Sequence, residues 1–145
     1  MPEESESRIL GIDYGTKRVG LALSDPLGVI AQPLTVLEPQ SIPDLLAEIR
    51  HLVEQHSIKT IVIGIPIRAN GTERGFSQKV REFGEVLASD LDIEVVYWDE
   101  RFSTQQAERA MREARLTSRE MRGKTDSVSA SLVLQTYLDH AKENQ

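Results

Sequence analysis

The stretch "RILGIDYGTKRVGLALSD", residues 8–25, combines an apolar run, a carboxylate and a basic turn. The apolar run ends at Asp13, and a turn containing a glycine follows it. Beyond the turn, Val19, Leu21 and Leu23 alternate with small residues, which is the period-two pattern of a strand. We therefore expect two strands joined by a short turn, with a carboxylate at the end of the first.

The segments that follow continue this pattern and then change period. Residues 28–37 predict a third strand, in which Pro33 marks an edge or a bulge. Residues 42–56 have helical spacing, and Ser41 with Asp44 resembles a capping box before them. The same patterns predict further strands at 60–66 and 93–98, and helices at 76–91, 103–115 and 125–141.

This order of elements indicates an α/β protein. Three strands with short turns suggest an antiparallel meander, and helices between the later strands imply two parallel crossovers. The expected sheet is therefore mixed and five-stranded, flanked by helices, with the element order of the RNase H-like fold. We expect one domain at 8–141, with short tails at 1–7 and 142–145.

The composition excludes several classes of protein. No apolar run approaches the ~18 residues of a membrane span, and the acidic start is unlike a signal peptide. The absence of cysteine excludes disulfides and thiolate metal sites. These features predict a soluble cytoplasmic protein that does not bind membranes.

The formal charge of −6 is unevenly distributed along the chain. Residues 101–124 contain seven basic and three acidic side chains, so this segment carries +4 and the remainder −10. Such asymmetry fits either a phosphate-facing patch on an acidic body or a solvated helix face of mixed charge. Composition alone favours the solvated face.

Four acidic residues fall at the ends of predicted elements. Asp13 ends the first strand, Asp99 and Glu100 end the fifth, and Asp126 opens the last helix, where helical counting points it inward. Neighbouring residues of a strand face opposite ways, so only one of Asp99 and Glu100 can share a face with Asp13. Each acid alone has an ordinary explanation, as a turn cap, a surface ion pair with Arg101 or a helix-start residue.

Convergence of three acids favours a metal site over these separate explanations. Carboxylates without His or Cys suit Mg²⁺ or Mn²⁺. Such ions activate water and stabilise the leaving oxygen when a phosphodiester is cleaved.

Four motifs carry a resemblance that covers nearly the whole chain. They are "GIDYGTKRVGLALSD" at 11–25, "VIGIPIRANGTERG" at 62–75, "DERFSTQQAE" at 99–108 and "RGKTDSVSASLVLQTYL" at 122–138. The chain resembles the YqgF/RuvX family of Holliday-junction-resolvase-like proteins, which is associated with cleavage at the 5′ side of the small-subunit rRNA precursor. The resemblance implies an RNase H-like fold and a Mg²⁺- or Mn²⁺-dependent catalytic triad of Asp13, Glu100 and Asp126, supported by Lys124 and Arg101.

One departure from junction resolvases concerns the fourth strand. Resolvases of this superfamily carry a catalytic acid at its end, whereas this chain has Gly64, Ile65 and Pro66 there. The triad is therefore expected to be completed from the fifth strand, by Glu100.

Basic side chains are expected to bind the nucleic acid. The candidates lie in the loops near the acids and on a helix with an arginine at every third position: Lys17, Arg18, Arg68, Arg74, Arg109, Arg112 and Arg115. The expected substrate is structured precursor rRNA, with ribosomal assembly particles as further partners. The sequence thus predicts a phosphodiester hydrolase in 5′-end processing of pre-16S rRNA during ribosome biogenesis. Two alternatives stay open, a nuclease of branched DNA and a non-catalytic nucleic-acid-binding module. The presence of all three acids favours the nuclease.

Overall fold

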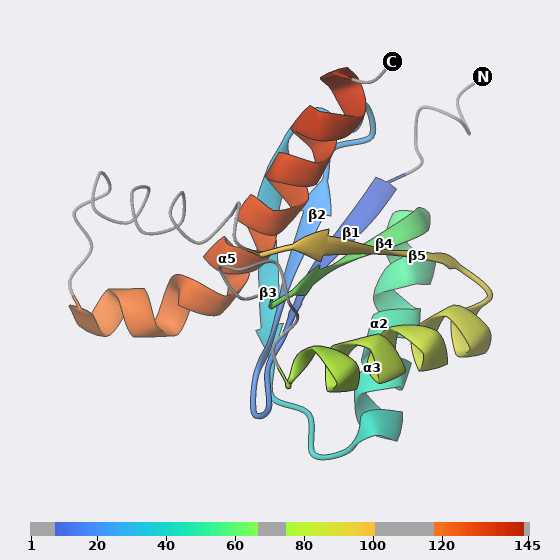
Figure 1. Cartoon of the computed structure of the whole chain (residues 1–145), viewed down its shortest axis with the longest axis vertical. Coiled ribbons are helices and arrows are strands. Elements are labelled where there is room, and N and C mark those ends of the chain that lie inside the picture. The colour runs from blue at the N-terminus through green and yellow to red at the C-terminus, as the bar shows by residue number, and fades with distance from the viewer. Residues whose placement is uncertain (1–7, 67–74, 101–117, 144–145) are drawn as a thin grey trace.

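The sheet is mixed and five-stranded, as predicted, with strand order β3-β2-β1-β4-β5 (Figure 1). The computed structural model describes residues 8–66, 75–100 and 118–143, and within the last range it describes side chains from Ser127 to Ala141. Pairing is antiparallel between β1, β2 and β3, and parallel between β1, β4 and β5. The strands are β1 (Arg8–Tyr14), β2 (Val19–Ser24), β3 (Ala31–Leu37), β4 (Ile58–Ile65) and β5 (Glu94–Asp99).

Helices cover both faces of the sheet (Figure 1). Helices α2 (Ile42–His56) and α3 (Ser77–Leu91) pack on one face, and α5 (Ser118–Glu143) packs on the other, mainly across β1, β2 and β3. The predicted cap of α2 is present, because the Asp44 N–H donates to Ser41 Oγ at 3.2 Å. None of the helices in the described ranges combines the length and hydropathy that a membrane crossing requires.

The last helix is longer than predicted. It runs from Ser118 to Glu143, whereas the sequence pattern predicted 125–141. Arg119, Glu120 and Met121 are strong helix formers, so no residue there stops the helix. Asp126 consequently lies inside the helix, and the expected stabilisation of its charge by the helix N-terminus does not apply. The helix predicted at 103–115 lies outside the described residues.

Pro33 has both of the roles that its position allowed. Strand β3 is an edge of the sheet. Its pairing with β2 shifts register, since Leu21 pairs with Thr35 but Ala22 pairs with Pro33. The extra residue forms a bulge. A proline is accepted there because its missing N–H removes no hydrogen bond from a regular ladder.

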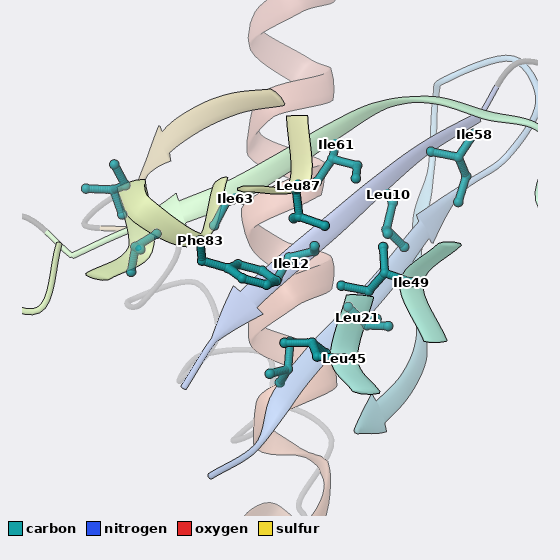
Figure 2. Close-up of a cluster of buried hydrophobic side chains, with 13 residues drawn as sticks. Leu10, Ile12, Leu21, Leu45, Ile49, Ile58, Ile61, Ile63, Phe83 and Leu87 are labelled. Atoms are coloured by element: carbon teal, nitrogen blue, oxygen red, sulfur yellow. The ribbon is translucent and has the colours of Figure 1, made fainter. Parts of the chain in front are cut away.

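The core follows the period-two alternation of β1 and β4. Leu10 and Ile12, with the alternate isoleucines of β4, face α2 and α3 in an apolar cluster (Figure 2). Gly11 faces the other way, toward α5. A Cβ built on Gly11 would lie 2.8 Å from Leu134 Cβ and 3.1 Å from the Ala130 carbonyl oxygen. The backbone of α5 therefore rests directly on the centre of the sheet.

The turn between β2 and β3 is organised by Asp25. Its Oδ1 accepts the N–H groups of Val29, at 2.7 Å, and Ile30, at 2.9 Å. Gly28 has a left-handed φ of 72° and donates its N–H to the Asp25 carbonyl oxygen at 3.0 Å. The Ile30 N–H, and next among the donors the Val29 N–H, lower the pKa of Asp25 because they stabilise its charged form.

Gly11→Ala should destabilise the fold by ~2 kcal/mol, because neither Leu134 Cβ nor a helix carbonyl can rotate away from the added methyl group. Gly75→Ala is the matched control, since a Cβ there meets nothing within 4 Å. Urea unfolding of the two variants measures the difference. A Gly11→Ala midpoint equal to that of the wild type would contradict the close approach of α5.

Asp25→Asn should cost up to ~1 kcal/mol at neutral pH, because the amide keeps an acceptor but loses the charge, and the site is largely solvated. The folded-state pKa of Asp25 is lowered, so its stabilisation is complete above the unfolded value of ~3.9 and disappears as pH falls through the folded value. The difference in unfolding free energy between wild type and variant should therefore vanish in strong acid. A difference that persists there would assign the effect to geometry instead of charge.

Candidate active site

Two of the three predicted acids lie on one face of the sheet, at its carboxyl-terminal edge. Asp13 follows Gly11 by two residues along β1, so it shares the face that packs against α5. Trp98 of β5 belongs to the apolar cluster under α5, and Glu100 lies two residues further on. The Glu100 N–H donates to the Ile65 carbonyl oxygen at 3.0 Å, which continues the pairing of β4 and β5 beyond the end of β5.

The Glu100 side chain fills the space above Gly64 of β4. Its Cγ and Oε1 each lie 2.9 Å from the position that a Cβ at Gly64 would take, and Val133 Cγ2 of α5 lies 3.2 Å from it. Strands β1 and β4 pair Ile12 with Ile63, and extending this register by one residue sets Asp13 beside Gly64. The Glu100 carboxylate therefore reaches across β4 toward the strand that carries Asp13.

Asp99 takes the opposite face. Tyr97, two residues earlier on β5, packs against the cluster beneath α2 and α3, so Asp99 is directed to that side by strand alternation. Of the two neighbouring acids, Glu100 is the one that shares the face of Asp13.

The backbone of α5 leads toward the same edge. Ala130 contacts Gly11, and Asp126 lies about one helical turn before it, in the direction of Asp13 and Glu100. The side chain of Asp126 is outside the described part of the structure, as are Arg101 and the side chain of Lys124. Within the side chains that are described, no three of His, Asp and Glu gather as metal ligands, so the predicted triad is untested.

Two of the predicted nucleic-acid-binding residues lie in the turn that follows the strand of Asp13. Lys17 and Arg18 are exposed in the turn between β1 and β2, and they line an open hollow of about 790 Å³ together with Glu38. The other candidates lie outside the described residues: Arg68, Arg74, Arg109, Arg112 and Arg115.

Aromatic stacking fixes the end of β1. The Tyr14 ring stacks on Phe83 of α3 at 4.4 Å between centroids and on Phe76 at 6.0 Å. Burial raises the pKa of Tyr14, because it disfavours the phenolate. The strand end that carries Asp13 is thus held against α3 on the opposite face.

The donor set suits a hard divalent cation. Asp13 and Glu100 offer carboxylate oxygens on adjacent positions of one sheet face, and the chain has no thiol. Magnesium and manganese prefer such oxygen ligands.

Gly64 is the residue of this site whose importance the sequence pattern did not reveal. In the sequence, Gly64 stands out only as a position near the end of the fourth strand that carries no acid. A glycine inside a strand signals a close approach by another group, and that signal was available.

A family model matches residues 7–140, and the family is RuvX, described as Holliday junction resolvase. The chain belongs to the RuvX family. A relative in Koribacter versatilis named "Putative pre-16S rRNA nuclease" is 39% identical over 95% of this chain and 90% of its own length. A relative of the same name in Clostridium acetobutylicum is 42% identical over 91% of this chain and 98% of its own length. Membership of this family supports a phosphodiester hydrolase.

Solved structures establish the fold independently of close sequence similarity. RuvC of T. thermophilus in complex with a Holliday junction superposes with a TM-score of 0.68 at 16% identity, covering 96% of this chain and 97% of the other. The Fowlpox virus resolvase in complex with Holliday junction DNA gives a TM-score of 0.59 at 10% identity, covering 92% and 98%. The RuvX chain therefore has the RNase H-like fold that its element order predicted.

Gly64→Ala should displace the Glu100 carboxylate while leaving the fold intact, because the added Cβ meets the flexible end of that side chain. We expect Mn²⁺ affinity, measured by calorimetry, to fall ~10-fold, as for changes that misplace metal ligands.

The control for this change is the double variant Gly64→Ala, Glu100→Gln. If Gly64 acts through Glu100, its substitution should have no further effect on Mn²⁺ affinity once Glu100 has lost its charge. If the loss of Mn²⁺ affinity in the double variant equals the sum of the losses in the two single variants, Gly64 acts independently of Glu100.

Proposed function

We propose that this RuvX protein is a divalent-metal-dependent nuclease that cleaves precursor rRNA at the carboxyl-terminal edge of its sheet. The observation that carries the proposal is the Glu100 carboxylate lying over Gly64, next to the register position of Asp13. Carboxylate oxygens at neighbouring positions of one sheet face are the ligands that a hard divalent cation prefers. A module that only bound nucleic acid would gain nothing from this arrangement.

Asp13, Glu100 and Asp126 would hold the Mg²⁺ or Mn²⁺ ion. The bound ion supplies the charge that activates a water molecule and stabilises the leaving oxygen of the phosphodiester. Lys124 and Arg101 would support the ligands from the same motifs.

The contribution of the chain itself is preorganisation. Asp13 is fixed because β1 is paired on both sides and the ring of Tyr14 is stacked on α3. Glu100 is fixed by its backbone bond to Ile65 and by contact with Gly64. Ligands held in this way lose little freedom when the ion binds.

One observation supports RNA as the substrate, and a second supports nucleic acid of either kind. Relatives about 40% identical over more than nine-tenths of the chain are named as pre-16S rRNA nucleases. The exposed Lys17 and Arg18, in the turn after the strand of Asp13, would bind the phosphate backbone, which is a sequence-independent contribution to affinity. Arginines in the segments that flank the site would extend this contact: Arg68, Arg74, Arg109, Arg112 and Arg115. With such a substrate, the protein would act in the cytoplasm, on ribosomal assembly particles.

Branched DNA is the second candidate substrate, because the family carries the description Holliday junction resolvase. The two substrates differ in the shape that the basic surface must follow. Cleavage of precursor rRNA and of a four-way DNA junction, measured in parallel, separates them.

Asp13→Asn should reduce Mg²⁺-dependent cleavage of precursor rRNA by at least ~100-fold, because the ion loses a charged ligand. Thermal stability without metal should hold or rise, since repulsion from Glu100 is relieved. RNA affinity without metal should be unchanged or slightly higher. Cleavage rates, melting temperatures and a binding titration in chelator give the three readouts.

Asp99→Asn is the matched control, because it makes the same chemical change at a carboxylate on the opposite face. It should leave cleavage within a few-fold of the wild type. Cleavage by Asp13→Asn at the wild-type rate would contradict a mechanism in which Asp13 binds the metal ion. Cleavage of the DNA junction alone would keep the mechanism and change the substrate.

A further inference from the structure

The end of the sheet opposite to the acids exposes a concentrated set of apolar side chains. In the turn between β2 and β3, Leu27 is 76% exposed, Ile30 53% and Val29 41%. Among the other described large hydrophobic residues, only Ile42 and Val86 are comparably exposed, and both lie on helices. Exposed apolar side chains that gather in this way mark interaction surfaces.

Polar contacts hold this turn, and its apolar side chains contribute little. Within the turn, Asp25 Oδ1 accepts the N–H groups of Val29 and Ile30. From outside, Gln135 of α5 donates its Nε2 to the Val29 carbonyl oxygen at 2.9 Å and accepts the Ala31 N–H at 2.8 Å. A turn held at both ends presents its side chains in fixed positions, so a partner that binds it loses little conformational entropy.

A hollow of about 420 Å³ adjoins the turn, and its wall is both apolar and cationic. Leu27 and Val29 form one side, with Tyr137 of α5 nearby. Arg8 and Lys59 line it as well, from the starts of β1 and β4. Within the described part of the chain, neither cation has an acidic partner.

We propose that this surface, formed by Leu27, Val29, Ile30, Arg8 and Lys59, docks an acidic segment of another protein. A large apolar side chain of the segment would enter the hollow beside Leu27, and flanking carboxylates would pair with Arg8 and Lys59. Complementary charge at such a rim selects the partner and accelerates its association. The proposal goes beyond the nuclease function, because the surface and the acids lie at opposite ends of β1.

The chemistry of the surface favours protein over RNA. Aliphatic side chains neither stack on bases as aromatic rings do nor donate hydrogen bonds to phosphates. Exposed aliphatic side chains beside cations therefore match an apolar and acidic protein segment better than a phosphate backbone. A protein seated here would leave the opposite edge open to the RNA.

The test is an NMR titration of the full ¹⁵N-labelled chain with a short synthetic peptide in which leucines alternate with glutamates. We expect shift changes at the amides of residues 27–30 and at Lys59. Leu27→Ser should weaken binding at least ~10-fold, as expected for an anchor in an interface. Lys59→Glu should weaken it as well, and should shift the preference to a matched peptide with lysine in place of glutamate.

Val86→Ser is the control variant, because it removes a large exposed hydrophobic residue from α3, away from the turn. It should leave binding unchanged. Equal weakening by Val86→Ser, no binding of the peptide, or shift changes confined to other residues would each overturn the proposal. Concentration-dependent self-association that Leu27→Ser abolishes would replace the partner with a second copy, and Leu27-dependent binding to phosphatidylserine vesicles would replace it with a membrane.

Cleavage separates this proposal from the nuclease function. Leu27→Ser should cleave naked precursor rRNA at the wild-type rate, because the turn is remote from Asp13 and Glu100. Asp13→Asn should bind the peptide as the wild type does. Loss of both properties in either variant would contradict the independence of the two sites.

Discussion

The close approach of α5 to the sheet is the constraint on which the rest of the structure depends. At Gly11 the helix lies so close to the strand that no side chain fits between them, because Leu134 and Ala130 occupy the space above the glycine. This contact buries one side of the central strands, the same sheet face that strand alternation gives to Asp13. The same helix runs past the turn held by Gln135 and on toward the acidic edge.

The period-two patterns of the strands and the capping signal of α2 were sufficient to predict most of the fold. The pattern in β1 and β2 needs only the local sequence, and so does the Ser41 cap, because both arise from contacts within a few residues. The start of α5 could not be predicted in this way. Residues with good helix propensity carry no boundary signal, so the helix extends until tertiary contacts end it.

In the candidate site, too, local sequence predicts some features, and others depend on long-range contacts. Strand alternation requires that only one of Asp99 and Glu100 share a face with Asp13, but it does not say which. The answer depends on how β5 pairs with β4 and on the space above Gly64, both of which are long-range features. The placement of Glu100 was therefore open to inference only through a family resemblance or a structure.

The space above Gly64 also restricts which residue strand β4 can carry at that position. Strand β4 carries no acid near its end, and the carboxylate of Glu100, which follows β5, occupies the volume above Gly64. A side chain on Gly64 and the present conformation of Glu100 exclude each other sterically. A larger side chain at position 64 would therefore require the Glu100 side chain to take another rotamer, which would move its carboxylate away from the strand that carries Asp13.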